Sequence, residues 1–149
     1  MEAIRDGFLR TTPGDRVSYQ QIGEEILAIC RRFAVQEILG DPLFQGAWLF
    51  EFLQDQAAEM MDFPQTITHF ARPTRVLEET VTAEQLRHGN NPLLRWQASN
   101  VVVYRDNNDN MRPDKKRSSE RIDEVVALIM ALAAVARVDT ECLPGVISF

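Results

Sequence analysis

One carboxylate of this sequence stands between a group of basic residues and a long apolar segment. Asp123 precedes the uncharged run 125–136, and five basic residues lie within ten positions before it: Arg112, Lys115, Lys116, Arg117 and Arg121. Carboxylate oxygens bind divalent metal ions, and lysine and arginine side chains neutralise the phosphates of nucleic acids. This combination suggests metal-dependent chemistry on a phosphate backbone.

The position of Asp123 on its expected helix leaves two interpretations open. The residue lies four, seven and eleven positions before Ala127, Met130 and Ala134, which indicates that it shares their helix face. Nothing basic follows at the fourth position, and an unpaired carboxylate on an apolar face is costly unless a cation or hydrogen-bond donors meet it. The alternative is that an acid in the first turn stabilises the helix dipole by roughly 0.3 to 1 kcal/mol.

A second carboxylate, Asp41, stands in the Gly40-Asp41-Pro42 turn after an expected strand. Ligand-handling groups collect at strand ends in open α/β sheets. Asp-Pro is also a common turn and helix-entry pair, so Asp41 could simply cap the next helix. Two carboxylates from different elements that meet at a strand end could hold Mg²⁺ or Mn²⁺, since both ions prefer oxygen ligands.

Composition limits the other possibilities. The formal charge of -6 argues against a sequence-independent DNA coat, although a local basic site remains possible beside the alternative of a solvated polar face. Cys30 and Cys142 have no metal-binding spacing and indicate neither zinc nor a disulfide. We expect Trp48 and Trp96 in the core. Patterns for phosphate-binding loops and serine nucleophiles are absent from the sequence.

The length of 149 residues and a hydrophobic content of 45% predict one soluble domain, residues 1–149. The run 125–136 is too short to cross a bilayer, which takes about 20 residues, and no leader pattern opens the chain. We therefore expect no membrane partner and a cytoplasmic location.

Periodicity and turn residues predict an α/β arrangement. Ser18 begins a helix to Phe33 with a capping-box pattern, and a buried strand is expected at 34–39. A helix at 43–60, a short strand at 66–68 and a helix from Thr74 to His88 follow. A helical turn at 93–99 and a strand at 100–105 precede a polar turn at 106–110. Ser118 or Ser119 is expected to cap the last helix, which ends near residue 137 before an irregular tail, 138–149.

Four short segments, in their order and spacing, carry a family resemblance. They are His88-Gly89-Asn90-Asn91-Pro92-Leu93-Leu94-Arg95-Trp96, Ser99-Asn100-Val101-Val102-Val103, Arg112-Pro113-Asp114-Lys115, and Arg121-Ile122-Asp123 with its apolar helix. Together they resemble the carboxy-terminal nuclease domain of the large terminase subunit of tailed bacteriophages and prophages. Gly7-Phe8-Leu9, Thr12-Pro13-Gly14 and Asp41-Pro42 also fit, so the similarity covers roughly residues 5–137.

The resemblance implies a ribonuclease H-like fold, with a central mixed sheet flanked by helices and acidic residues that bind two Mg²⁺ or Mn²⁺ ions. In that family the ions serve metal-dependent cleavage of double-stranded DNA during genome packaging, alongside the small terminase subunit and the portal protein. By position, Asp41 and Asp123 resemble the second and third catalytic, metal-binding acids. The residues expected to contact DNA are Arg95, Arg112, Lys115, Lys116, Arg117 and Arg121.

The sequence also departs from the family pattern. The family's first catalytic acid lies upstream of Gly7-Phe8-Leu9, so we expect this chain to lack it, together with the ATPase domain, and to be incomplete at the amino-terminal end of the fold. Asp6 and Asp15 are poor replacements. Glu124 stands where a small residue is expected, and Asn90 replaces a Gly. Enzymatic activity is therefore an open expectation, and the alternative is a non-catalytic DNA- or protein-binding remnant of a prophage terminase.

Overall fold

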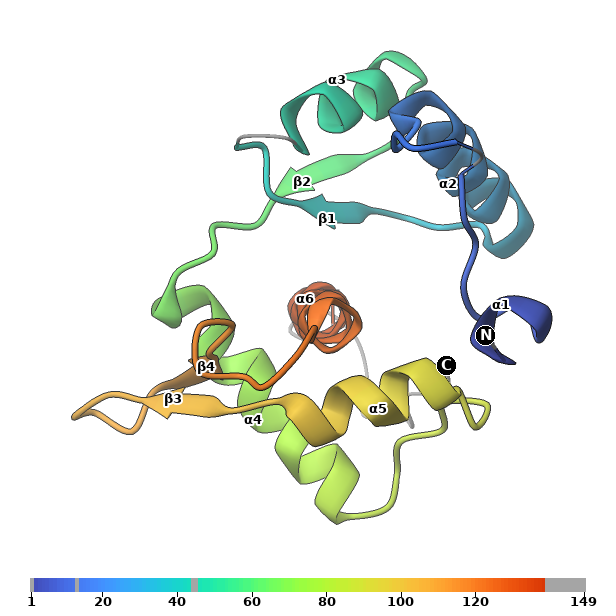
Figure 1. The fold of residues 1–149 in the computed structure, drawn as a ribbon. Helices are drawn as coiled ribbons and strands as arrows, with labels where there is room; N and C mark the ends of the chain where they lie inside the picture. Colours follow the sequence, from blue (N-terminus) through green and yellow to red (C-terminus); the bar gives the residue numbers. More distant parts are fainter. Residues whose placement is uncertain (1, 13, 44–45, 139–149) are drawn as a thin grey trace. The chain divides into compact units, whose positions relative to one another are not determined.

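The protein folds into two compact units in the computed structural model, which describes residues 2–12, 14–43 and 46–138 (Figure 1). Unit 1 takes its residues from 1–9 and 65–149, and unit 2 from 10–64. The single domain 1–149 stays a prediction, because two compact units can both belong to one domain. The expected tail 138–149 lies outside the described residues, apart from its first residue.

Unit 2 begins with the helix that the sequence predicts most clearly. Helix α2 spans Tyr19–Phe33, and the hydroxyl oxygen of Ser18 accepts a hydrogen bond from the backbone N–H of Gln21 at 3.3 Å. This bond satisfies one of the free N–H groups of the first turn. The helix ends at Ala34, whose left-handed backbone (φ 48°) turns its N–H back to the carbonyl of Cys30.

The strands of unit 2 form a short parallel pair. Strand β1 (Ile38–Gly40) pairs with β2 (Met60–Asp62), with Ile38 opposite Met60 and Gly40 opposite Asp62. Helix α3 (Ala47–Asp55) connects them and contacts both α2 and β2. The predicted helix 43–60 was too long, because the left-handed Ala57 (φ 59°) redirects the chain into β2. No alternating pattern marks β2, since its pairing with β1 is a tertiary contact.

The core of unit 2 uses different aromatic residues from those expected. Phe50, Leu53 and Phe63 are buried. Trp48 is 48% exposed and stacks on Phe52 with ring centroids 5.3 Å apart, so its expected core position was wrong. Trp96 of unit 1 is also largely exposed, at 45%.

Unit 1 is built around helix α6 (Asp123–Val138), which packs against α4 (Ile67–Thr82) and α5 (Pro92–Asn100). Strands β3 (Val103–Arg105) and β4 (Met111–Pro113) form an antiparallel hairpin, and β4 also contacts α4. A short helix α1 (Glu2–Arg5), which the sequence did not indicate, belongs to the same unit. The buried residues of α6, together with the residue just before it, lie on one face: Ile122, Val125, Val126, Ile129 and Leu132.

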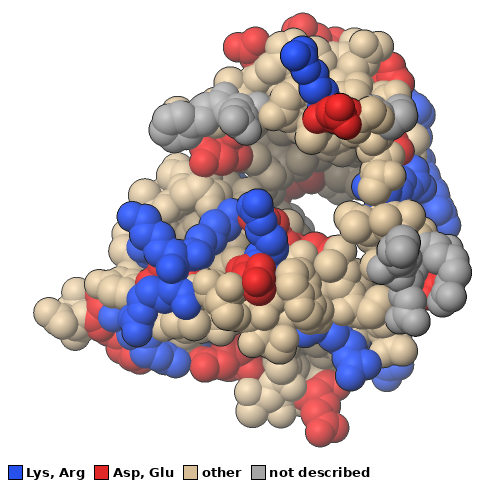
Figure 2. Space-filling view, in the orientation of Figure 1, with Lys and Arg blue, Asp and Glu red and all other residues tan. Residues whose placement is uncertain are grey.

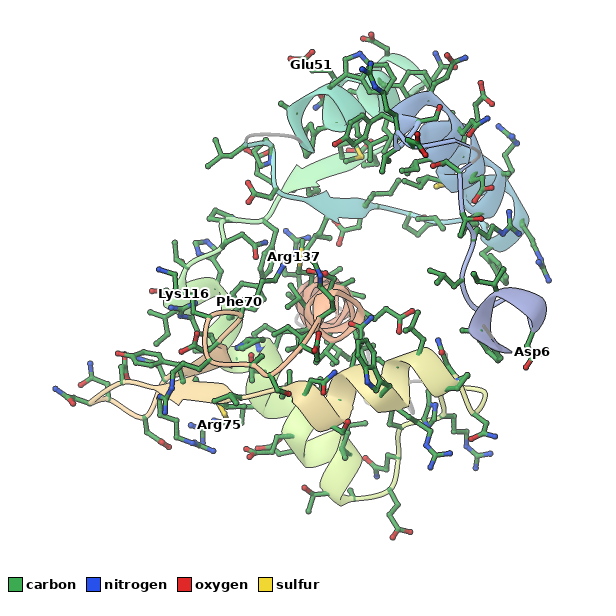
Figure 3. The ribbon with its side chains drawn as sticks, in the orientation of Figure 1. Asp6, Glu51, Phe70, Arg75, Lys116 and Arg137 are labelled. Carbon is green, nitrogen blue, oxygen red and sulfur yellow. The ribbon has the colours of Figure 1, made fainter. Side chains whose placement is uncertain are left out.

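Helix α4 replaces two elements predicted from the sequence. The strand expected at 66–68 and the helix expected from Thr74 are one helix that begins after the extended Thr66 and passes through Pro73. Phe70 and Thr74 are buried on it, whereas Arg75 is exposed; Figure 3 shows Phe70 and Arg75 on this helix. Packing of this face on α6 therefore outweighs the β-branched pattern of Thr66-Ile67-Thr68 and the interior proline.

The polar segment 106–110 forms the predicted turn, and one carboxylate organises it. Asp106 Oδ1 accepts hydrogen bonds from the N–H groups of Asn108 and Asn110, both at 2.9 Å, and its Oδ2 accepts from Asn110 Nδ2 at 3.0 Å. The Asn110 side chain is the main cause that lowers the pKa of Asp106, because these bonds favour the ionised carboxylate.

An ionic network joins the hairpin to α4. Asp109 binds Arg105 at 3.0 Å and Arg75 at 3.2 Å, and Arg105 also pairs with Glu78 at 3.3 Å. The hydrogen bonds from Arg105 and then Arg75 hold the pKa of Asp109 below its ordinary value of 3.8. All four side chains are exposed, so solvent screens the network.

The loop that carries the basic residues is fixed at its start. Asp114 N donates to the carbonyl of Val102 at 2.8 Å, and its own Oδ1 accepts from the N–H groups of Lys116 and Arg117. Ser118 Oγ donates to the carbonyl of Asp114 at 2.8 Å and accepts from Val102 N at 3.1 Å. The basic turn is therefore held against the residues that precede β3.

Neither predicted serine caps the last helix. Ser118 is engaged with Asp114 and Val102, and Ser119 Oγ donates to Asn100 Oδ1 at 3.2 Å. The buried Gln97 of α5 acts in their place, because its Oε1 accepts a hydrogen bond from the first-turn N–H of Glu124 at 2.7 Å. A cap from another helix leaves no local sequence signal.

The architecture confirms the α/β class. The described residues contain one parallel and one antiparallel pair of strands, in separate two-stranded sheets, with helices beside them. The expected central mixed sheet is therefore not found in this part of the chain, because the two strand pairs do not hydrogen-bond to each other. None of the described helices has both the length and the apolar character needed to span a bilayer.

We predict that replacing Asp109 by Asn removes an acid-sensitive contribution to stability. Asn tolerates the left-handed backbone of this position (φ 60°) and keeps the turn, but it loses the charge. Because the folded pKa is lowered, the network stabilises the protein above pH 3.8 and loses this effect as pH falls through the folded value.

Denaturant unfolding of wild type and Asp109→Asn across this pH range measures the effect. The variant should be less stable well above pH 3.8, and the difference should vanish in stronger acid and shrink in high salt. An equal difference at all pH values would contradict the network.

We also predict that Ser118→Ala lowers the free energy of unfolding by roughly 1 to 2 kcal/mol, because the partly buried N–H of Val102 loses its acceptor. Ser119→Ala is the matched control: its exposed bond to Asn100 should matter by less than about 0.5 kcal/mol. Urea unfolding of both variants provides the comparison, and equal effects would show that Ser118 is not the anchor.

Candidate nuclease site

Asp123 is exposed and ion-paired, which corrects its expected place on a buried face. Its Oδ1 lies 2.8 Å from Lys115 Nζ, and the two side chains are 60% and 56% exposed. Ala127 is exposed and Met130 is half-buried, so the face that they share with Asp123 is the open side of α6. The helix-dipole interpretation and a cation-binding role are both compatible with this position, at the first residue of α6.

Glu124, the neighbour that departs from the family pattern, points into more buried surroundings. Its Oε2 is buried without a hydrogen-bond partner, and burial raises the pKa of this carboxyl group. Asn90, the other departure, adopts a left-handed backbone (φ 57°). Glycine takes this conformation readily and asparagine tolerates it, so the turn before α5 is preserved.

Asp41 directly follows strand β1, as the sequence predicts, and holds a tight turn. Its Oδ1 accepts a hydrogen bond from the N–H of Leu43 at 3.0 Å. Gly46 lies so close to this turn that an added Cβ would stand 2.8 Å from the carbonyl oxygen of Asp41. The turn-forming alternative therefore holds locally.

The two acids belong to different units, Asp41 to unit 2 and Asp123 to unit 1, so their meeting at one metal site stays a prediction. Across residues 2–12, 14–43 and 46–138, no three His, Cys, Asp or Glu side chains gather as a metal-binding group. Each carboxylate still provides the hard oxygen ligands that Mg²⁺ and Mn²⁺ prefer. The ammonium of Lys115 shows that a cation fits against Asp123.

Figure 2 shows lysine and arginine side chains gathered over β4 and the loop between β4 and α6, with acidic side chains among them. This basic segment contains the residues predicted from the sequence, Arg112, Lys115, Lys116, Arg117 and Arg121. Lys115, Lys116, Arg117 and Arg121 are exposed, and Figure 3 labels Lys116. Arg112 is half-buried, and its guanidinium lies 5.4 Å from the ring centroid of Tyr104.

Arg95, the sixth predicted DNA contact, is placed on α5 instead. It is exposed, and its Nη1 donates to Asn90 Oδ1 at 3.2 Å. The start of this helix is fixed by Asn91, whose Oδ1 accepts from the N–H groups of Leu93 and Leu94, and by Pro92 at its first position.

Three contacts that position the site have no signal in the sequence. Lys115 and Asp123 are eight residues apart and pair across a loop, outside the helical spacing that pattern analysis considers. Gln97 binds the N–H of Glu124, 27 residues away, and Ser118 binds the N–H of Val102, 16 residues away.

Known proteins resemble this chain over most of its length. A family model described as "Terminase large subunit, endonuclease domain" matches residues 1–139. Protein YmfN of Escherichia coli K12 is 32% identical over 131 residues, which cover 87% of this chain and 29% of YmfN. The large terminase subunit of Enterobacteria phage HK97 is 31% identical over 137 residues, covering 88% of this chain and 26% of that protein.

Solved structures agree with the sequence matches. The crystal structure of the HK97 large terminase matches with a TM-score of 0.79 and 28% identity, covering 89% of this chain and 28% of that one. The large terminase nuclease from thermophilic phage G20c matches with a TM-score of 0.58 and 16% identity, over 80% of this chain and 62% of that one, which shows a shared fold. The predicted ribonuclease H-like nuclease fold is thereby confirmed.

The chain spans less than a third of the length of its HK97 and YmfN relatives. The matched region nevertheless includes both predicted acids and the basic segment. The chain belongs to the family of terminase large subunit endonuclease domains.

Proposed function

We propose that this chain forms part of a metal-dependent endonuclease that cuts double-stranded DNA during packaging of a phage or prophage genome. The observation that carries the proposal is the exposed Asp123, which already accepts a cation and adjoins the basic segment. Membership of the terminase nuclease family supports the same chemistry.

Asp41 and Asp123 would hold Mg²⁺ or Mn²⁺ through carboxylate oxygens. When bound, such ions activate water and stabilise the charge that develops on phosphate oxygens. The chain itself contributes the orientation of these acids: the turn at Leu43 fixes one, and the start of α6 fixes the other. No third acid is assigned from the described residues.

The basic segment would bind the phosphate backbone. Lys116, Arg117 and Arg121 are exposed on a loop whose start is anchored by Asp114 and Ser118. Phosphate contacts of this kind position DNA without reading its sequence. We place Arg112 and Arg95 in supporting positions, because Arg112 is half-buried on Tyr104 and Arg95 is bonded to Asn90.

By family membership we propose a small terminase subunit and a portal protein as packaging partners, and the cytoplasm of a bacterial host as the location. These assignments concern the longer proteins to which this chain is similar.

A second candidate function is a non-catalytic DNA-binding module. It is favoured by the ion pair of Asp123 with Lys115, which neutralises this carboxylate without a metal ion. In this case the basic segment binds DNA and the acids serve as helix-end and turn residues.

Nicking of supercoiled plasmid in a manganese titration separates the two functions. The nuclease should convert plasmid to the open circle only with Mn²⁺, and Asp123→Asn should reduce nicking to background because it removes a metal-binding charge. Asp41→Asn should do the same while its amide oxygen still accepts from Leu43 N, so the turn is kept.

Both variants should unfold with a transition like that of the wild type. Wild-type nicking rates in Asp123→Asn would refute the catalytic assignment. A folded wild-type chain that binds duplex DNA without nicking it would favour the second function.

Both candidate functions predict that Lys116→Met weakens duplex binding. Loss of one phosphate contact should reduce the slope of log affinity against log salt by about 1. Arg31→Met, a charge change in the last turn of α2 in unit 2, is the control. Fluorescence anisotropy at several salt concentrations measures the duplex affinity of both variants. Equal salt slopes for the two variants would contradict DNA binding at the basic segment.

A further inference from the structure

The most direct contact between the acidic and basic parts of the candidate site is the Lys115–Asp123 ion pair. The ammonium nitrogen lies 2.8 Å from Asp123 Oδ1, with more than half of each side chain exposed. A divalent ion bound to this oxygen would occupy the same space as the ammonium group. Because the two cations compete for this oxygen and repel each other, a cation bound at Asp123 weakens binding of the other.

The backbone around Lys115 is held by hydrogen bonds, whereas the end of its side chain is exposed to solvent. On either side of it, Asp114 Oδ1 accepts from the N–H groups of Lys116 and Arg117, and Ser118 bonds to Val102 and Asp114. These bonds hold the backbone of the turn. The Lys115 side chain has a flexible four-carbon stem, and in the described part of the chain its ammonium group pairs with Asp123 alone. It can therefore reach a nearby phosphate without movement of the loop.

The Lys115–Asp123 ion pair is weak enough for a divalent ion to replace the ammonium group. Exposed ion pairs are weak, and a lysine held this way should reduce the affinity of a competing cation by only about 1.4- to 5-fold. A divalent ion carries twice the charge and takes several oxygen ligands at once. It can therefore displace the ammonium group at ordinary concentrations.

We propose that Lys115 occupies the cation position of Asp123 until Mg²⁺ or Mn²⁺ displaces it, and that the released ammonium then binds a DNA phosphate. This inference rests on the proposed function. The ion pair protects Asp123 from remaining an uncompensated anion among phosphates when the metal is absent. Displacement by the metal in turn makes the lysine more available to DNA phosphates.

The exchange couples metal and DNA binding. DNA phosphates that attract Lys115 leave Asp123 open to metal, so DNA should raise the affinity for the ion. Thermodynamic linkage requires that the ion raise the affinity for DNA by the same factor. A lysine that contacted only solvent, or only Asp123, would not give this coupling.

Manganese titration without DNA, followed by the electron paramagnetic resonance signal of free Mn²⁺, tests the first step. Lys115→Met should bind Mn²⁺ about 1.4- to 5-fold more tightly than the wild type, because the competing ammonium is gone. Lys115→Arg should keep wild-type affinity, because it keeps a cation beside Asp123. Lys116→Met is the control for charge alone: its ammonium makes no ion pair with Asp123 in the described part of the chain.

The second step is tested with Ca²⁺, which takes oxygen ligands, and a short duplex followed by fluorescence anisotropy. Ca²⁺ should strengthen duplex binding by the wild type more than by Lys115→Met, whereas Lys116→Met should retain the wild-type enhancement. Equal Mn²⁺ affinities in Lys115→Met and Lys116→Met would overturn the exchange. An equal Ca²⁺ enhancement in these two variants would overturn the coupling to DNA.

Asp123→Asn distinguishes failure of this inference from failure of the proposed function. If that variant binds Mn²⁺ as tightly as the wild type, the metal site itself is misplaced. If it loses Mn²⁺ while both lysine variants behave alike, the metal site stands and only the role of Lys115 fails. Unchanged thermal transitions of the exposed lysine variants confirm that folded proteins are compared.

Discussion

Burial of one face of α6 is the constraint on which unit 1 depends. Ile122, Val125, Ile129 and Leu132 pack this helix against α4 and α5, and the cost of exposing them fixes its rotation about its axis. The rotation in turn places Asp123 on the open side and the carboxylate of Glu124 in partly buried surroundings. A single hydrophobic stripe therefore decides which of two adjacent carboxylates meets cations and which is partly desolvated.

The site combines opposite charges that would be of little use separately. A negative protein gains no general attraction to DNA, so binding must come from a short basic segment held in one shape. Asp114 and Ser118 hold that conformation through local hydrogen bonds. Asp123 adds a negative charge directly beside Lys115. Asp114, Glu120 and Asp123 stand beside these basic residues and lower the local positive charge, which limits non-specific binding to nucleic acid.

Elements with local signals were predictable from the sequence. The Ser18 cap and apolar period predicted α2, the Asp41-Pro42 turn closed β1, and the 106–110 turn was expected. Elements set by distant partners were not: β2 depends on β1, α4 on its packing with α6, and the start of α6 on Gln97. The same division holds for the site. The resemblance predicted Asp41 and Asp123 as metal-binding acids, whereas only the folded structure shows that Lys115 reaches Asp123 across a loop.

Asp41 follows a strand of only three residues in a two-stranded sheet, which is too small to be stable alone and depends on packing against α3. The ladder bonds from Ile38 and Phe63 to Glu59 and Gly40 are thus among those that local unfolding should break at low free-energy cost. Opening of this pair would withdraw Asp41 from its turn while leaving α6 folded. The free energy of this local unfolding therefore contributes to the affinity of any ligand that binds Asp41. A ligand bound there would slow hydrogen exchange along β1.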